Sequence, residues 1–284
     1  MTHFDPRLTP ARPDLAARHL QGQIAATTYV EGHWCVVLDA AVPVRRVPAP
    51  DATLETEALM GERVRVYETT DEGWSWGQLE TDGYVGYLPA NALSTAATVP
   101  THKVVAIRTL MFPGPSIHLA PITAPPLGAK LSIVSQDERF AATAAGGYVP
   151  VKHLGPLDRF ETDFVAVAER FLGVPYLWGG KTSLGIDCSG LVQVALAACG
   201  IAAPRDSDLQ EHALGALLPG NDYERGDLLF WRRHVAIVRD RDTLLHANAY
   251  AMAVTIEPIA DALARVRDSH GDPTSIKRLA PTCR

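Results

Sequence analysis

The segment Asp187-Cys188-Ser189-Gly190 carries the residue of this chain that is best suited to covalent chemistry. Residues 191–199 are apolar almost throughout, which predicts a buried helix that Gly200 ends. Cys188 would then lie at the N-terminus of this helix, where unpaired backbone amides and the helix dipole stabilise negative charge. Because the thiolate is the nucleophilic form of cysteine, we expect a reactive Cys188, with amides nearby that could hold an oxyanion.

A cysteine nucleophile needs a base, and the base usually needs a partner that orients it. His234 opens one short β-prone run and His246 lies in another, so adjacent antiparallel strands could bring both imidazoles together against the helix of Cys188. We predict that Cys188 is the nucleophile, that His234 takes its proton and that His246 fixes the tautomer of His234. An amide substrate would then be hydrolysed through a thioester. The same three residues could instead bind zinc, but the helix-terminal cysteine favours a nucleophile, and we expect no metal and no cofactor.

The elements that position these residues follow from the apolar pattern. Residues 160–172 have apolar side chains at helical spacing, and Gly173 and Pro175 would end this helix. Residues 253–266 are predicted to form a strand followed by a short helix. Three further runs would be strands of one sheet: 228–231, 234–238 and 243–249. Helices followed by consecutive strands indicate an α+β layer arrangement.

The first half of the chain instead has short β-prone runs between Gly, Asp and Pro residues: 34–38, 63–68, 74–80 and 82–88. This spacing predicts a small barrel or sandwich. The plan recurs in weaker form, because 61–68 is similar to 128–135 and 82–93 is similar to 146–154. Two small β domains in tandem explain this repeat most simply. The N-terminal residues are rich in Pro, Arg and Ala, and we expect an arm with a short helix at 14–21.

These motifs resemble known families. A Gly-Glu before a strand, Gly73-Trp74 at a hairpin and the closing Gly-Tyr-Val-Gly-Tyr resemble the bacterial SH3-like domain, although the second copy lacks the Gly-Trp. The second half resembles the NlpC-type peptidases, which are papain-like cysteine peptidases acting on peptidoglycan peptides. Five segments carry this resemblance: Trp-Gly-Gly, Asp-Cys-Ser-Gly, Gly-Asp-Leu-Leu-Phe (226–230), His-Val-Ala-Ile (234–237) and Leu-His-Ala (245–247).

The resemblance implies a multidomain chain with an arm (1–26), two all-β SH3-like barrels (27–97 and 98–155) and an α+β papain-like peptidase domain (156–284). The whole plan is similar to the γ-D-glutamyl-L-diamino acid endopeptidases of murein-peptide recycling. It implies cleavage between γ-linked D-Glu and meso-diaminopimelate or L-Lys, in a small murein peptide with a free N-terminal L-Ala.

The same resemblance implies a set of substrate-binding residues: Tyr176, Asp187, Ser189, Asp206, Ser207, Glu55 and Tyr84. Tyr176 would donate toward the oxyanion or a substrate carbonyl. From the first SH3-like domain, Glu55 (or Glu57) and Tyr84 (or Tyr87) would close the end of the cleft that receives the free amine. Ser207 has a second interpretation, since Ser-Asp-Leu-Gln at 207–210 is a capping box that would make it a helix N-cap.

Composition limits the competing classes of function. The net charge of −6 offers no basic field for nucleic acid, and the longest apolar run has ten residues, about half of a membrane span. The first residues lack the apolar core of a signal peptide, and the four cysteines form no disulfide framework. We therefore expect a cytoplasmic protein without an obligate protein partner. Cys35, Cys199 and Cys283 are predicted to be structural.

Two other functions stay open at this stage. A papain-like amidase or acyltransferase would use the same nucleophile and base on another amide. Alternatively, the SH3-like pair could bind cell wall beside a degenerate peptidase domain, although the intact cysteine and two histidines argue against this.

Overall fold

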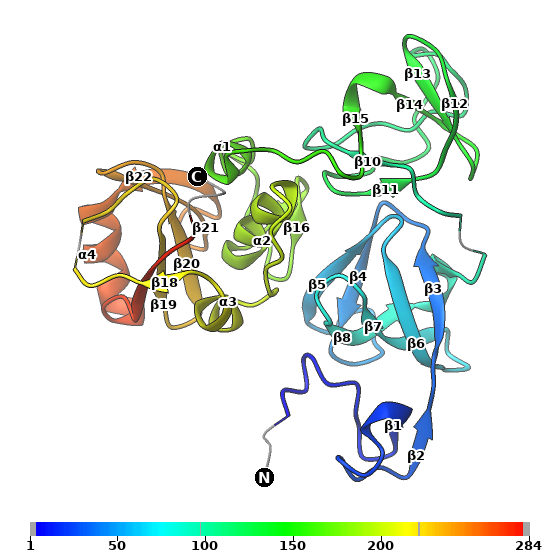
Figure 1. The fold of residues 1–284 in the computed structure, drawn as a ribbon, viewed down its shortest axis with the longest axis horizontal. Helices are drawn as coiled ribbons and strands as arrows, with labels where there is room; N and C mark the ends of the chain where they lie inside the picture. The colour runs from blue at the N-terminus through cyan, green and yellow to red at the C-terminus, as the bar shows by residue number, and fades with distance from the viewer. Residues whose placement is uncertain (1–3, 97, 221, 281–284) are drawn as a thin grey trace. The chain divides into compact units, whose positions relative to one another are not determined.

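The computed structural model describes residues 4–96, 98–220 and 222–280. Cys283, which we predicted to be structural, lies outside them. The chain divides into two compact units, Met1–Leu157 and Asp158–Arg284 (Figure 1). The first unit contains the predicted arm and both predicted SH3-like segments, and the second begins two residues after the predicted start of the peptidase domain. No helix within the described residues is both long and apolar enough to cross a bilayer.

An antiparallel sheet of seven strands, in the order β5-β4-β8-β7-β6-β3-β9, dominates the first unit. Its strands are β3 (His33–Val37), β4 (Ala41–Arg45), β5 (Leu54–Leu59), β6 (Arg63–Thr69), β7 (Trp74–Leu79), β8 (Val85–Pro89) and β9 (Leu93–Ser94). All four β-prone runs predicted in this region therefore form strands. Inward-facing side chains alternate along them, and Val42, Val44, Val64, Val66 and Leu88 belong to one buried cluster.

Two three-stranded sheets follow, in the orders β11-β10-β15 and β12-β13-β14. Their strands are β10 (His102–Val104), β11 (Lys130–Leu131), β12 (Ile133–Gln136), β13 (Phe140–Thr143), β14 (Tyr148–Pro150) and β15 (Leu154–Pro156). They enclose a buried cluster of their own that includes Val104, Leu131 and Val149.

The sequence repeat is also a repeat of local structure. After β8, Pro89 (φ −57°, ψ 124°) precedes a 3-10 helix, Ala90–Ala92, and then β9. After β14, Pro150 (φ −57°, ψ 126°) precedes a 3-10 helix, Val151–His153, and then β15. The two segments that we aligned at 82–93 and 146–154 thus have the same succession of elements. A complete second barrel of the SH3-like type stays a prediction.

The prediction of a short helix at 14–21 is wrong. Leu15–Ala17 forms β1, which pairs in parallel with β2 (Thr28–Val30), and only Arg18–Leu20 forms a 3-10 turn. Tertiary packing decides this, because Leu15 and Leu20 are buried in a cluster with Tyr67 and Trp76 of the barrel. The arm therefore covers aromatic side chains of the first unit.

The second unit is built on an antiparallel sheet in the order β18-β23-β19-β20-β21-β22. Its strands are β18 (Ala216–Leu217), β19 (Leu228–Trp231), β20 (His234–Val238), β21 (Thr243–Asn248), β22 (Ala253–Pro258) and β23 (Ser275–Arg278). Its helices are α1 (Phe164–Glu169), α2 (Cys188–Ala198), α3 (Ser207–Ala213) and α4 (Ile259–His270). Helix α2 packs on β20 and β21, and α4 packs on β21 and β22; in Figure 1 the sheet lies between them.

This unit confirms the predicted α+β arrangement, with one helix shorter than expected. Helix α1 begins only at Phe164, because the carboxylate of Asp163 accepts the Ala166 backbone N–H at 3.0 Å and caps the helix there. Phe160 and Leu172, which we had counted in its apolar stripe, are exposed. The short strand β23 was not predicted, and it joins β18 to β19.

Candidate active site

Cys188 is the first residue of α2, as predicted, and Asp187 is its N-cap. The Asp187 carboxylate accepts the backbone N–H of Gly190 at 2.7 Å, which satisfies one of the amides left free in the first helical turn. On the other side, a backbone hydrogen bond from Val235 reaches the Cys188 thiol. Val235 follows His234 directly, so the start of β20 lies beside the start of α2.

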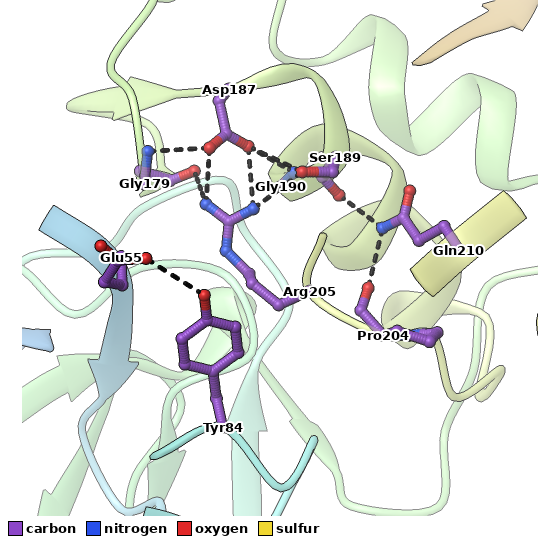
Figure 2. Close-up of polar contacts among 10 residues, drawn as sticks. Glu55, Tyr84, Gly179, Asp187, Ser189, Gly190, Pro204, Arg205 and Gln210 are labelled. Carbon is purple, nitrogen blue, oxygen red and sulfur yellow. Dashed lines mark hydrogen bonds and ion pairs between the residues drawn. The ribbon is translucent and has the colours of Figure 1, made fainter. Parts of the chain in front are cut away.

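The buried side chain of Arg205 holds the Asp187 carboxylate in place (Figure 2). Its Nη1 donates to Oδ1 of Asp187 at 2.9 Å and its Nη2 donates to Oδ2 at 2.8 Å, a two-point contact that fixes the carboxylate plane. The backbone N–H of Gly179 donates to the same carboxylate at 2.8 Å. Asp187, which we predicted to contact substrate, thus already accepts several bonds inside the protein, and its geometry is that of a residue that positions Cys188. Nothing in the sequence pointed to Arg205.

Ser189 belongs to the same network. Its hydroxyl donates to Asp187 at 3.3 Å and accepts from Arg205 at 3.0 Å, while its backbone carbonyl accepts from Gln210 at 2.9 Å. The side chain is buried. Whether Ser189 also contacts substrate stays a prediction.

The capping box predicted at 207–210 is wrong. Asp206, not Ser207, is the N-cap of α3, and it makes no side-chain capping bond. The reason is that the Gln210 amide does not reach back to the helix start. It donates instead to the carbonyls of Ser189 and Pro204, which ties α3 to the first turn of α2 (Figure 2). The substrate-binding roles of Asp206 and Ser207 stay predictions.

Three glycines allow the chain to pack closely around the cysteine. A Cβ on Gly190 would collide with the carbonyl oxygen of Gly180, and a Cβ on Gly180 would collide with the carbonyl of Gly185. The hairpin of β16 (Lys181–Thr182) and β17 (Gly185–Ile186) therefore lies directly against the first turn of α2. This close approach explains why the Trp-Gly-Gly and Asp-Cys-Ser-Gly motifs occur together.

The electrostatics of Cys188 differ from our expectation of a resting thiolate. Burial raises the pKa of the thiol to about 12, and the neighbouring Asp187 charge acts in the same direction. The backbone bonds from Val235 and Ser189 and the Arg205 charge oppose this, but they do not outweigh it. Placement at a helix N-terminus is therefore not sufficient to ionise Cys188, and a base must remove its proton.

The two predicted histidines do meet. Strands β20 and β21 pair antiparallel, and Nε2 of His234 lies 2.9 Å from Nδ1 of His246. His246 is fully buried, whereas His234 is partly exposed. Beyond the pair, Nε2 of His246 lies 2.5 Å from Oε1 of Glu257 on β22, which sequence reasoning missed. The only available signal was that Glu257 is an acidic residue in a predicted strand.

Tyr176 also belongs to this region. Its backbone N–H donates to Met252 at 2.9 Å and it bridges to Ile186, next to the cap of α2. Burial raises the pKa of its hydroxyl well above the usual value, and the neighbouring Cys188 contributes to the rise. The hydroxyl therefore stays protonated and can donate a hydrogen bond beside the cysteine.

The remaining predicted residues lie in the first unit. Glu55 on β5 forms a bidentate ion pair with Arg46, at 2.8 and 2.9 Å, and the Tyr84 hydroxyl donates to its Oε2 at 3.4 Å (Figure 2). Both line an open pocket of about 680 Å³ that also contains Tyr87. The Tyr87 hydroxyl instead accepts from Arg12 at 2.8 Å. The structure thus brings Glu55 and Tyr84 into contact, and the role of these residues, or of Glu57 and Tyr87, in closing the cleft stays a prediction.

Within the described ranges, no group of three or more His, Cys, Asp or Glu side chains is arranged to hold a metal ion.

Comparison with known families agrees with this arrangement. Residues 173–267, which contain Tyr176, Cys188, His234 and His246, match the NlpC/P60 family. This segment is an NlpC/P60 domain. Residues 44–93 match the family described as the bacterial dipeptidyl-peptidase Sh3 domain, so the first predicted SH3-like domain is confirmed.

The NlpC/P60 domain and its SH3 domain have relatives of the same plan. The γ-D-glutamyl-L-lysine dipeptidyl-peptidase of Bacillus subtilis is 29% identical over 243 residues, which cover 75% of this chain and 78% of that protein. The protein of the same name from Bacillus cereus is 24% identical, covering 72% and 71%. A crystal structure of an NlpC/P60 family protein from Bacillus cereus has a TM-score of 0.74 at 20% identity, covers 87% of this chain and 100% of its own, and thus shares the fold. The chain is homologous to γ-D-glutamyl-L-lysine dipeptidyl-peptidases.

Proposed function

We propose that this protein is a cysteine peptidase that hydrolyses the bond between γ-linked D-Glu and the diamino acid of murein peptides. Its substrates would be small peptides with a free N-terminal L-Ala, released during murein recycling and cleaved in the cytoplasm. The homologues named γ-D-glutamyl-L-lysine dipeptidyl-peptidase support the substrate class. The observation that supports this chemistry most is the position of His234. It is hydrogen-bonded to His246, and the next residue, Val235, makes a backbone hydrogen bond to the Cys188 thiol.

The reaction would begin with proton transfer from Cys188 to His234. Because Nε2 of His234 is bonded to His246, Nδ1 is the nitrogen that receives the proton. The sulfur attacks the γ-carbonyl carbon of D-Glu, and the carbonyl oxygen becomes an oxyanion. Backbone amides at the start of α2 and the Tyr176 hydroxyl would donate hydrogen bonds to it.

The tetrahedral intermediate then collapses. Its C–N bond breaks, His234 gives its proton to the departing amine of the diamino acid, and a thioester to Cys188 remains. Water adds to the thioester while His234 accepts one of its protons. When the C–S bond breaks, the sulfur leaves as a thiolate, and the proton held by His234 restores the thiol. One product is a dipeptide that carries the γ-carboxylate. The other is the free diamino acid, or a peptide that begins with it.

Substrate selection would involve the first unit. Glu55 is ionisable, largely covered and already aligned by Arg46 and Tyr84, so it could pair with the free α-ammonium of L-Ala. A charge-assisted bond of this kind is about twice as strong as a neutral one. Asp206 and Ser207 would contact the L-Ala-γ-D-Glu portion of the peptide.

The test is cleavage of L-Ala-γ-D-Glu-meso-diaminopimelate followed by mass spectrometry. Cys188→Ala should abolish cleavage while the protein stays folded, and Cys199→Ala, at the other end of α2, should retain it. Full activity of Cys188→Ala would remove the nucleophile from the proposal. Acetylation of the L-Ala amine should lower kcat/KM at least tenfold in the wild type. Equal cleavage of blocked and free peptide would instead remove the role of Glu55.

A further inference from the structure

The polar chain that starts at His234 crosses three neighbouring strands and ends on a helix. His234 on β20 bonds to His246 on β21, and His246 bonds to Glu257 on β22. From α4, the guanidinium of Arg265 forms an ion pair with the same Oε1 of Glu257. The imidazole of His246 is thus bonded at both nitrogens, and the carboxylate oxygen that it contacts also pairs with Arg265.

The charge of Glu257 determines which atoms carry protons. Burial acts to raise the pKa of this carboxyl group, but the bonds and charges of His246 and Arg265 outweigh burial and hold the pKa below its usual value. An ionised carboxylate can only accept hydrogen bonds. Nε2 of His246 must therefore carry the proton that lies between the two groups.

The tautomer of His234 follows from that of His246. A neutral imidazole donates from one nitrogen and accepts at the other, so Nδ1 of His246 is an acceptor once Nε2 donates to Glu257. Nε2 of His234 then has to be the donor in the bond of 2.9 Å between the rings. Nδ1 of His234 is then the nitrogen without a proton, which is the form that a base needs.

We propose that Glu257, braced by Arg265, is a positioning residue that sets the tautomers of both histidines and keeps Nδ1 of His234 unprotonated. Its effect on catalysis rests on the proposed function, whereas the tautomers themselves do not. The ionisable groups around the pair include Cys188 and Tyr176 beside the start of β20, Arg233 directly before it, Glu257 on β22 and Arg265 on α4.

The tautomers can be measured without substrate, in Cys188→Ala protein labelled with ¹⁵N-histidine. Long-range ¹H–¹⁵N correlation spectra near pH 7.5 should show both rings protonated at Nε2 alone. Glu257→Gln should convert His246 to a mixture, because a glutamine amide can also donate to its Nε2. A wild-type His246 protonated at both nitrogens, or a His234 protonated at Nδ1, would overturn the proposal.

Kinetics provide the second measurement. Glu257→Gln should lower kcat about 10- to 100-fold, as is typical when a partner that orients a functional histidine is lost, with little change in KM. It should also move the acidic limb of the pH profile to lower pH, since removal of the anion makes the imidazolium easier to deprotonate. Glu169→Gln, which removes the negative charge from the 2.7 Å contact with Arg239 elsewhere in the same unit, is the control and should change neither kcat nor the acidic limb. An unshifted limb in Glu257→Gln would refute the role. If the tautomers are as expected but wild type cleaves no murein peptide, only the proposed function fails.

A second feature, Arg233, immediately precedes His234 in the turn between β19 and β20. Its backbone is left-handed, with φ of 68°, and its guanidinium lies 5.5 Å from the ring centroid of the half-exposed Trp178. Burial and Cys188 raise the pKa of the Tyr176 hydroxyl, and the Arg233 charge opposes them, so this charge acts on a side chain beside the cysteine. None of the ion pairs found among the described residues involves Arg233.

We propose that Arg233 binds the distal carboxylate of the departing diamino acid, which makes the protein selective for meso-diaminopimelate over L-Lys. This inference rests on the proposed function. A guanidinium beside the departing residue attracts a carboxylate and repels an ammonium. Diaminopimelate carries both groups at the end of its side chain, whereas lysine carries only the ammonium. The stacked Trp178 would hold the guanidinium in position.

The test compares two tripeptide amides, L-Ala-γ-D-Glu-meso-diaminopimelate and L-Ala-γ-D-Glu-L-Lys, whose α-carboxyl groups are blocked so that only the side chains differ. The wild type should show a kcat/KM at least tenfold higher for the diaminopimelate peptide. Arg233→Gln should remove most of this preference, and Arg232→Gln, its exposed neighbour, should keep it. Equal cleavage of the two peptides by the wild type, or a preference that survives in Arg233→Gln, would overturn the proposal. Failure to cleave either peptide would count against the proposed function instead.

Discussion

Loss of one partner from the buried ion pair between Arg205 and Asp187 should be among the most destabilising single changes in the second unit. The Arg205 side chain is 1% exposed and that of Asp187 is 9% exposed, with N–O distances of 2.8 and 2.9 Å. Arg205→Met keeps most of the side-chain volume but leaves a buried carboxylate without its cation. Breaking a buried pair in this way costs about 3–5 kcal/mol.

The chain offers a matched control on α4. Arg267 pairs with Asp272 at 2.7 Å, but these side chains are 64% and 71% exposed. An exposed pair contributes about 0–1 kcal/mol, so Arg267→Met should have little effect. The two variants remove the same residue type from pairs of similar length, and the pairs differ in burial and in the further bonds that Arg205 makes to Ser189 and Gly180.

The assay is differential scanning calorimetry of the full chain, combined with hydrogen exchange of residues 188–198. Arg205→Met should lower the Tm of the second unit by roughly 10 °C or more, at about 3 °C per kcal/mol, and should speed exchange in α2. Adding Asp187→Asn should recover part of the loss, because it removes the unpaired charge. If Arg205→Met and Arg267→Met shift the Tm equally, burial does not set the strength of this pair.

Three further predictions follow from the structure. Iodoacetamide should label Cys188 near neutral pH in wild type, where His234 can accept the proton of the thiol, and much more slowly in His234→Ala, where burial still raises the pKa of the thiol but that base is gone; equal labelling of both proteins at pH 7 would contradict the role of the base. The stability that this raised pKa contributes is complete below pH 9 and is lost as the pH rises through about 12. Gly190→Ala should reduce both activity and Tm, since its Cβ would collide with Gly180; an unchanged Tm would show that the hairpin can move away. Leu20→Ala should destabilise the first unit by about 2–5 kcal/mol, measured by urea unfolding and tryptophan fluorescence, and a loss below 1 kcal/mol would mean that the arm is not part of the core.

Local patterns were sufficient for most elements and for the central residues of the site. Alternating apolar residues predicted β19, β20 and β21, and the apolar run closed by Gly200 predicted α2 with Cys188 at its start. The two β-prone runs with one histidine each were enough to predict that the imidazoles meet, because consecutive strands usually pair. These features depend on neighbours in the sequence, which is why they could be found there.

Interactions between distant segments of the chain were either missed in the sequence or predicted wrongly from it. The Ser-Asp-Leu-Gln segment has the pattern of a capping box, yet Gln210 bonds to carbonyls of other segments because it is buried against them. The 14–21 segment forms β1 and a short turn because the barrel offers aromatic side chains to cover. The helix propensity of a short segment contributes little free energy, and tertiary contacts override it when they bury enough surface.

By itself, the sequence determined that Cys188, the nucleophile that we propose, begins a buried helix, because residue type and helix signals are local properties. Only the tertiary structure decided the protonation state of the resting thiol, since burial, Asp187 and Arg205 come from packing rather than from the motif. Tertiary structure likewise decided that Glu257 bonds to His246, because bonds across β20, β21 and β22 depend on strand register, which no short motif encodes.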